Sequence, residues 1–342
     1  MKKTQIICSI GPASQKVDVL EKMIENGMNI ARFNMSHGTH ESHTELIENV
    51  KKASKAKKKK VAIMIDTKGP EIRIKKFENG QIFLNDGDVF ILTTNDVVGN
   101  QNMVSVSYQN LPKVVKRGTK ILADDGKIEL RVEKTNKTDI LCKVVDGGPL
   151  KDRKSLNLPG TDTKMEFLSD LDKADLQFAK EMGADYVALS FVNYPEDVLK
   201  TRKFLDSIGL EHVKIISKIE SAEGVKNFDK ILKVTDGVMV ARGDLAVEID
   251  YVKIPYLQKE FIKKCNQANK PVIVATQMLS SMTGEPRPTR AEISDVANAV
   301  YDGTDMIMLS EETTSGNFPA ESVHAMRRIA DEAEKTKKRL PM

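Results

Sequence analysis

The stretch from Val213 to Glu248, VKIISKIESAEGVKNFDKILKVTDGVMVARGDLAVE, decides the fold class. It contains two short apolar runs, Val213–Ile216 and Gly237–Val240, and each run is bounded by polar residues. Such runs are typical of parallel strands that are buried on both faces of a sheet. Charged residues follow both runs at once. A charge at the end of a buried strand is costly unless it is paired, so the pattern indicates a functional site.

Two carboxylates, Glu220 and Asp244, follow these two runs. If the runs are neighbouring parallel strands, the two side chains lie close enough to share one divalent cation. Oxygen ligands favour Mg²⁺ or Mn²⁺ over zinc. Lys218 would place a positive charge beside the metal for an anionic substrate. The alternative is a simple salt bridge between Lys218 and one of the two carboxylates.

The composition excludes several classes of protein. The chain has 342 residues, and its 53 Lys and Arg nearly balance its 49 Asp and Glu, which argues against a dedicated nucleic-acid binder. No apolar run reaches the length that spans a membrane. The three cysteines, Cys8, Cys142 and Cys265, form no CxxC motif, so neither a disulfide framework nor a zinc site is indicated. We expect a cytoplasmic protein without nucleic-acid or membrane partners.

Apolar runs alternate with amphipathic segments along most of the chain, which predicts a (β/α)8 TIM barrel with about eight strands. The predicted strands are Gln5–Ile10, Asn29–Phe33, Val61–Ile65, Tyr186–Leu189, Val213–Ile216, Gly237–Val240, Val272–Ala275 and Asp305–Leu309.

The pattern of apolar runs and amphipathic segments changes between the third and fourth strands. Here short segments of alternating apolar and polar residues are separated by Gly-containing turns. Two of these turns, at Asn79-Gly80 and Asp125-Gly126, have the sequence of hairpin turns. We therefore predict an all-β lid domain of residues 71–159, inserted after strand three. The barrel would comprise residues 1–70 and 160–342.

The catalytic groups of such barrels lie at the C-terminal ends of the strands. Polar residues follow nearly all the predicted strands here, namely Arg32, Asn34, Asp66, Thr67, Ser190, Lys218, Glu220, Arg242, Asp244, Thr276, Gln277, Ser310 and Glu312. Cations around a divalent ion suit phosphoryl transfer, whose transition state spreads negative charge over oxygens, and Arg32, Arg73, Lys218 and Arg242 are the candidates. The chain has no GxxxxGK[ST] or GxGxxG motif. A nucleotide would therefore bind in the open cleft between barrel and lid.

A second polar cluster is expected at the ends of strands two and three. Its members are Asn34, Ser36, Asp66 and Thr67. Neutral oxygens with a single carboxylate suit a monovalent cation. The alternative is ordinary hydrogen bonding within the loops.

Seven motifs, found along the whole chain, resemble those of the pyruvate kinase family and follow that family's order. They are Asn29–Gly38, Asp66–Arg73, Ile216–Glu220, Met239–Leu245, Ala275–Leu279, Pro286–Glu292 and Asp295–Ala299. The resemblance implies transfer of the phosphoryl group of phosphoenolpyruvate to ADP, which gives pyruvate and ATP in the last step of glycolysis. The predicted insert falls where this family carries its lid.

The resemblance also implies roles around the transferred phosphoryl group. Glu220 and Asp244 would hold Mg²⁺ (or Mn²⁺), and Lys218 and Arg32 would face the phosphoryl group. The pyruvyl part would be held by Gly243, Asp244 and Thr276, with Thr276 near the path by which the enolate gains its proton.

Further residues correspond to the family's potassium and nucleotide sites. Asn34, Ser36, Asp66 and Thr67 match the K⁺ ligands, and Glu71 is the residue type that accompanies K⁺ dependence. The nucleotide contacts would be Asn34, His37, Arg73 and Lys154, of which Lys154 comes from the lid and Arg73 also faces the reacting groups.

The chain departs from the family pattern in three respects. Ala246 stands where the family usually has glycine, and Glu311 replaces another glycine and adds a carboxylate at the rim of the site. The resemblance includes no C-terminal domain, which carries the family's effector site and a subunit interface. We therefore expect no activation by a sugar phosphate, and any homo-oligomer would form through the barrel.

Two other functions remain open. One is an aldolase or lyase that acts on the enolate of pyruvate on a related barrel. The other is a truncated pyruvate kinase core that binds substrate or a partner with weak or no turnover. Lys154 of the lid and the segment Asn34–His37 favour the kinase over the lyase, because a lyase needs neither.

Overall fold

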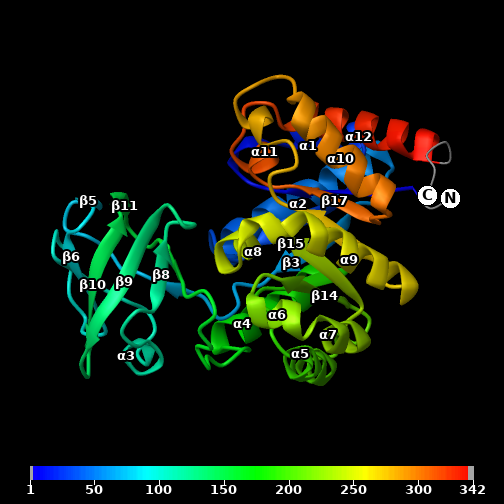
Figure 1. The fold of residues 1–342 in the computed structure, drawn as a ribbon. Helices are drawn as coiled ribbons and strands as arrows, with labels where there is room; N and C mark the ends of the chain where they lie inside the picture. Colours follow the sequence, from blue (N-terminus) through cyan, green and yellow to red (C-terminus); the bar gives the residue numbers. More distant parts are fainter. Residues whose placement is uncertain (1–2, 338–342) are drawn as a thin grey trace.

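A computed structural model describes residues 3–337, so the ends of the predicted barrel domain, residues 1–2 and 338–342, lie outside the described residues. Within this range eight parallel strands close into a barrel, which confirms the predicted fold (Figure 1). The barrel strands are β1 (Gln5–Ser9), β2 (Met28–Asn34), β3 (Ala62–Asp66), β13 (Tyr186–Leu189), β14 (Lys214–Ile219), β15 (Gly237–Ala241), β16 (Val272–Ala275) and β17 (Met306–Leu309).

Helices surround the barrel, and their apolar faces pack against the outer faces of the strands. The helices are α1 (Val17–Asn26), α2 (His40–Lys57), α4 (Asp170–Met182), α5 (Pro195–Ser207), α6 (Ala222–Lys226), α7 (Phe228–Val234), α8 (Arg242–Glu248), α9 (Ile254–Gln267), α10 (Arg290–Asp302), α11 (Glu311–Thr314) and α12 (Pro319–Thr336), with 3-10 turns η1 (Pro12–Ser14), η2 (Tyr251–Lys253) and η3 (Ser280–Thr283). Among residues 3–337, no helix combines the length and apolar character needed to cross a membrane.

The inside of the barrel changes from apolar to polar toward the C-terminal ends of the strands. Ile216 belongs to the apolar cluster inside the barrel, and Lys218 lies two residues further along β14. Because side chains alternate across a strand, both point to the same face. The same step from an apolar to a polar residue occurs at Ile7 and Ser9, Ile30 and Arg32, Met64 and Asp66, Ala188 and Ser190, and Met308 and Ser310. The strands thus deliver a polar layer to the barrel mouth.

At the opposite end of the barrel, every second strand has an Asp or Asn at or next to its first residue. The side chain of this residue holds the start of the preceding strand in place. In each case a side-chain oxygen accepts a hydrogen bond from a backbone N–H near the start of the neighbouring strand. The four pairs are Asn29 with Ile6 (2.9 Å), Asp185 with Ile63 (2.9 Å), Asp236 with Ile215 (2.9 Å) and Asp305 with Val272 (3.0 Å). These bonds set the register of the strands in pairs, which gives this end of the barrel a structural role.

Between β3 and α4 the chain forms a separate seven-stranded sheet and a two-stranded sheet. Their strands are β4 (Ile72–Arg73), β5 (Gln81–Leu84), β6 (Val89–Thr93), β7 (Met103–Ser105), β8 (Lys120–Ala123), β9 (Ile128–Thr135), β10 (Asp139–Asp146), β11 (Gly148–Lys151) and β12 (Ser155–Asn157). The turn around Asp125 joins antiparallel β8 and β9 as predicted. The Asn79-Gly80 turn is not a hairpin turn, because β5 pairs with the distant β11. The insert also contains one short helix, α3 (Leu111–Val114).

The hydrophobic core of the insert is separate from the core between barrel and helices, and the two share no residue. We therefore predict that Leu130→Ala, in the fully buried core of the insert, lowers the local stability of the insert by about 2–5 kcal/mol. Amide hydrogen exchange should rise in the insert and stay unchanged in the barrel. The matched variant Leu309→Ala, equally buried in the barrel, should show the reverse. Equal loss of protection in both parts for either variant would show that they unfold as one unit.

Candidate active site

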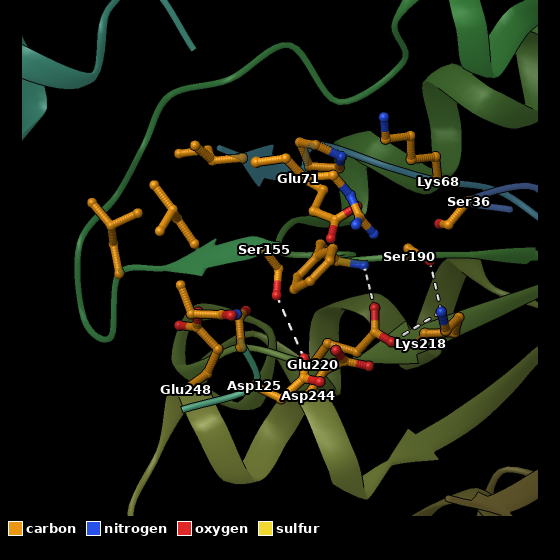
Figure 2. Close-up of a pocket in the computed structure, with 18 of the residues that line it drawn as sticks. Ser36, Lys68, Glu71, Asp125, Ser155, Ser190, Lys218, Glu220, Asp244 and Glu248 are labelled. Atoms are coloured by element: carbon orange, nitrogen blue, oxygen red, sulfur yellow. Dashed lines mark hydrogen bonds and ion pairs between the residues drawn. The ribbon is translucent and has the colours of Figure 1, made fainter. Parts of the chain in front are cut away.

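A cleft of about 330 Å³ lies between the barrel mouth and the insert (Figure 2). Most of the predicted site residues line it, namely Arg32, Asn34, Ser36, His37, Arg73, Lys154, Lys218, Glu220 and Asp244. Asp66 and Thr67 are buried beside it, and Gly243 and Thr276 do not line it. The structure thus brings together residues that are up to 212 positions apart in the sequence (244 − 32).

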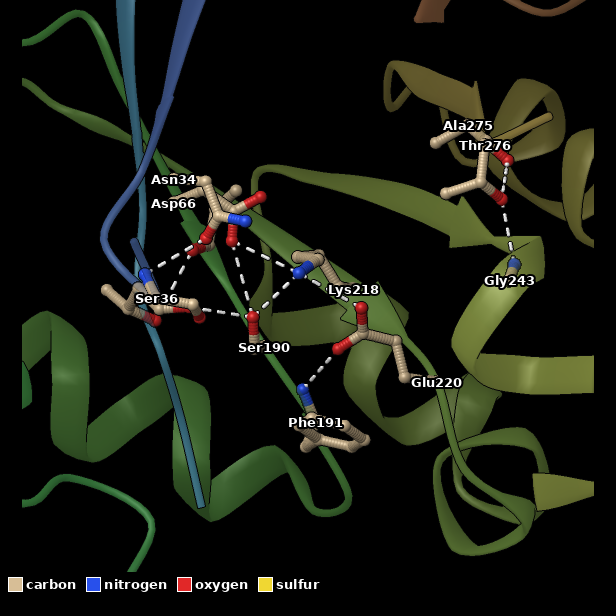
Figure 3. Close-up of polar contacts among 12 residues, drawn as sticks. Asn34, Ser36, Asp66, Ser190, Phe191, Lys218, Glu220, Gly243, Ala275 and Thr276 are labelled. Carbon is tan, nitrogen blue, oxygen red and sulfur yellow. Dashed lines mark hydrogen bonds and ion pairs between the residues drawn. The ribbon is translucent and has the colours of Figure 1, made fainter. Parts of the chain in front are cut away.

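The ammonium group of Lys218 is buried between two carboxylates (Figure 3). Its Nζ lies 3.1 Å from Asp66 Oδ1 and 3.0 Å from Glu220 Oε1, and it donates a hydrogen bond of 2.6 Å to Ser190 Oγ. Burial disfavours the charged form, but Asp66 and Glu220 outweigh it and raise the pKa of Lys218. Lys218 is therefore a fixed positive charge. The sequence left open a simple salt bridge between Lys218 and a carboxylate as the alternative to a metal site. Such a salt bridge is present with Glu220, and it lies in the cleft that the other predicted site residues line.

Asp66 holds two of the cations in place. Its Oδ2 accepts a 2.6 Å hydrogen bond from Arg32 Nε, while Oδ1 faces Lys218. Burial alone would raise the pKa of Asp66, but Arg32 and Lys218 outweigh it and lower the pKa. Arg32 also donates to Ser9 Oγ at 2.8 Å. The sequence assigned Asp66 only to a cation site, whereas the structure shows that it orients both basic side chains.

Glu220 is fully buried and only half satisfied. Its Oε2 accepts a 2.7 Å hydrogen bond from the backbone N–H of Phe191. Its Oε1 has Lys218 as a charged neighbour but no aligned hydrogen-bond donor. Burial raises the pKa of Glu220 to about 8, with Lys218 opposing the rise and Asp244 adding to it. A cation between Glu220 and Asp244 would supply the missing partner.

Glu220 and Asp244 suit a magnesium ion whose coordination shell is completed by oxygens of a substrate. Both side chains line the same cleft (Figure 2). Among residues 3–337, His, Cys, Asp and Glu form no group of three or more that could hold a metal ion. Mg²⁺ in proteins is commonly held by one or two carboxylates, with substrate oxygens and water as the other ligands. The donor set therefore fits Mg²⁺ with a bound anion.

Three of the nine residues other than glycine that have a positive φ among residues 3–337 lie just after two of the barrel strands. Phe191 follows β13 with φ +55°, and Thr276 and Gln277 follow β16 with φ +68° and +52°. Residues other than glycine rarely adopt this conformation, and it often marks functional sites. At Phe191 this conformation accompanies the hydrogen bond that its backbone N–H donates to Glu220. No pattern in the sequence pointed to Phe191, and Ser190 was recognised only as a polar strand end.

Helix α8 was not predicted from the sequence. It starts directly after β15 and carries Gly243 and Asp244 in its first turn. The N–H of Gly243 donates a 2.7 Å hydrogen bond to Thr276 Oγ1, which places these two predicted pyruvyl-binding residues in contact. Arg242 was predicted to be a cation of the barrel mouth, and it directly follows β15. Its guanidinium pairs with Asp295 at 2.8 Å and donates to the carbonyl of Thr276 at 2.7 Å, and it does not line the cleft.

The predicted nucleotide contacts come from both sides of the cleft, since Asn34 and His37 lie at or just after the end of barrel strand β2 and Arg73 and Lys154 belong to the insert. Lys154 Nζ lies 2.6 Å from Asp124 Oδ1, and Arg73 Nε donates to Glu71 Oε2 at 2.8 Å. Burial and the nearby Arg73 lower the pKa of His37, which favours the neutral imidazole. A second cavity of about 660 Å³ shares three lining residues with the cleft, namely Arg32, Asn34 and His37.

The predicted potassium ligands lie at the ends of β2 and β3. Asn34 and Asp66 are direct partners in the register of these two strands, and Asn34 Oδ1 accepts a 3.1 Å hydrogen bond from the N–H of Ser36. Thr67 Oγ1 donates to the carbonyl of Ala188 at 3.4 Å. The four residues are thus close neighbours. Their oxygens fit a site for a monovalent cation, and they also take part in the hydrogen bonds expected under the alternative.

We predict that Asp66→Asn destabilises the protein strongly, because it leaves Lys218 and Arg32 without their shared buried carboxylate. Removing one partner from a buried ion pair costs about 3–5 kcal/mol. The free energy of unfolding can be measured by chemical denaturation. As a control, Asp96→Asn breaks the exposed pair with Lys75, which should change the stability little because water and salt screen such a pair. Equal losses in the two variants would contradict the role given to Asp66.

Comparison with known proteins agrees with this geometry. The family model for the pyruvate kinase barrel domain matches residues 1–323. Proteins named pyruvate kinase from Clostridium perfringens, Geobacillus stearothermophilus and Bacillus licheniformis are 51%, 49% and 49% identical over 335, 331 and 336 residues. These alignments cover 98%, 96% and 98% of this chain but only 71%, 56% and 57% of the relatives, so the chain spans little more than half the length of two of them. The chain belongs to the pyruvate kinase family.

Proposed function

We propose that the chain transfers the phosphoryl group of phosphoenolpyruvate to ADP and produces pyruvate and ATP, with Mg²⁺ (or Mn²⁺) and K⁺ as cofactors. Membership of the family supports this reaction. The observation that carries it is the pairing of a buried, permanently charged Lys218 with a half-satisfied Glu220 at a cleft that Asp244 also lines.

Glu220 and Asp244 would hold the divalent cation. When bound, the metal would supply positive charge to the carboxylate and phosphoryl oxygens of the substrate. Lys218 and Arg32, at the mouth of the barrel, would add two further positive charges beside the phosphoryl group. Because Asp66 holds both cations before substrate arrives, little reorganisation is needed as charge develops on the phosphoryl oxygens.

In the proposed reaction the bond between phosphorus and the enol oxygen of the substrate breaks, and a β-phosphate oxygen of ADP forms the new bond to phosphorus. Gly243 and Thr276 would hold the pyruvyl part at the edge of the site. The enolate would then take up a proton at its methylene carbon through water near Thr276. The contact between Gly243 and Thr276 would keep these two groups in fixed positions.

The nucleotide would lie between barrel and insert. Asn34 and His37 would contact its phosphates from the barrel, and Arg73 and Lys154 would approach from the insert. The larger second cavity shares His37 with the cleft and offers the apolar surface of Pro12 and Leu46 to the base. Glu311 also lines this cavity, where its carboxylate adds negative charge beside the nucleotide.

Potassium would be held by Asn34, Ser36, Asp66 and Thr67, with Glu71 nearby in the cleft. We predict that the activity requires K⁺ and that Thr67→Val raises the K⁺ concentration for half-maximal activity about tenfold, because one oxygen ligand is lost. The Mg²⁺ requirement should stay unchanged. A rate that is independent of K⁺ in the wild type would contradict the potassium site.

We predict that Lys218→Met lowers kcat at least about 10²- to 10³-fold, as expected for the loss of a charge that stabilises the transition state. A coupled assay with phosphoenolpyruvate, ADP, Mg²⁺ and K⁺ measures this loss. The control is Lys214→Met, which changes an exposed lysine of the same strand and should retain the wild-type rate.

The same assay separates the alternatives. A lyase or aldolase would consume an enolate or a pyruvate adduct without ADP. A core that only binds its ligands would show saturable binding of phosphoenolpyruvate with no turnover. Equally slow turnover by the wild type and Lys218→Met would rule out the kinase proposal.

A further inference from the structure

The insert is joined to the barrel by two chain segments, residues 67–71 and 158–169. Gly69 of the first segment has φ +68°, and a Cβ there would lie 2.7 Å from the carbonyl oxygen of Ser190, so only glycine fits. Its N–H donates a 2.9 Å hydrogen bond to Asp172 of α4. Because these two segments connect the insert to the barrel, movement of the insert as a lid would pivot about them.

At the start of the second of these segments, the insert contacts the barrel at the end of α8. Asn157 Nδ2, at the end of β12, donates a 3.0 Å hydrogen bond to Glu248 Oε1. The backbone N–H of Leu158 donates to the same carboxylate. A Cβ on Gly126, in the turn between β8 and β9, would lie 3.6 Å from the side chain of Val247. The last two residues of α8 are therefore covered by the insert.

The first turn of α8 belongs to the active site. The N–H of Gly243 is bonded to Thr276, and Asp244 lines the cleft. The helix has only seven residues, and Leu245 is the one that is buried. The start of α8 is also held by Arg242, which pairs with Asp295, whereas its end is held by the contacts with the insert. In Figure 1 α8 lies on the side of the barrel that faces the insert.

We propose that Glu248 is a positioning residue that couples the position of the insert to Asp244. When Asn157 and Leu158 bind the Glu248 carboxylate, the end of α8 is fixed, and Asp244 is fixed with it because both lie on one short helix. Closure of the insert and metal binding then favour each other, since coupling between two equilibria is reciprocal. The effect on catalysis rests on the proposed metal-binding role of Asp244.

The Asn157–Glu248 pair can be broken and rebuilt with its donor reversed. Asn157→Asp places a second carboxylate against Glu248 and replaces the hydrogen bond by repulsion. Adding Glu248→Gln restores a donor and an acceptor, because the introduced amide can donate to the introduced carboxylate and its oxygen can accept from Leu158. The double variant also keeps the net charge of the wild type. Neither change removes a proposed metal ligand.

Two readouts are needed, amide hydrogen exchange of residues 242–248 and 158–169, and the Mg²⁺ concentration for half-maximal activity. Asn157→Asp should raise both about tenfold, a size typical of losing a group that orients a metal ligand, and should change kcat less. The double variant should return both to within about twofold of the wild type. The control is Asn136→Asp, which makes the same change beside another carboxylate, Asp139, at the far hairpin of the insert, and should alter neither readout.

Wild-type values of both readouts in Asn157→Asp, or no recovery in the double variant, would overturn the proposal. The exchange measurement needs no turnover, so it also separates the two hypotheses. Exchange that rises in the single variant and recovers in the double variant, in a chain without kinase activity, would support the contact and refute the proposed function.

Discussion

The site depends on one buried ammonium group, that of Lys218, held between Asp66 and Glu220. Burying these charges is costly, and only their mutual attraction and the added bonds from Arg32, Ser190 and Phe191 make the arrangement tolerable. The arrangement leaves Oε1 of Glu220 beside the ammonium of Lys218 but without an aligned hydrogen bond. A protein that needed these residues only for stability would gain from an apolar replacement, so the unmet carboxylate argues for a ligand at this position.

The barrel explains how residues distant in sequence reach this point. Inside each strand the side chains alternate, and one step beyond the apolar interior the same face presents Ser9, Arg32, Asp66, Ser190 and Lys218. The opposite end of the barrel has different chemistry, with Asp and Asn side chains that bond to neighbouring strands. Stability and function are therefore divided between the two ends of the same strands.

The fold was largely predictable because apolar runs and turns are local signals. The features that the sequence did not predict depend on contacts between residues that are far apart in the chain. The fifth barrel strand was expected to end at Ile216, but it continues to Ile219, because charged Lys218 is paired inside the barrel with Asp66, 152 residues earlier. Helix α8 was missed because Gly243 and Asp244 read as loop residues. The ion pair of Arg242 with Asp295 was not predicted either, because Asp295 lies 53 residues away. The contact between Asn157 and Glu248 has no sequence signal at all. The individual roles of the site residues remain predictions.

A crystal structure of the protein with Mn²⁺ and phosphoenolpyruvate would show whether Glu220 and Asp244 hold the metal beside Lys218. We expect anomalous density for Mn²⁺ coordinated by one oxygen each of Glu220 and Asp244, with the ammonium of Lys218 against the phosphoryl group. Density for the metal elsewhere, or Glu220 still bonded only to Lys218 and Phe191 with substrate bound, would contradict this expectation.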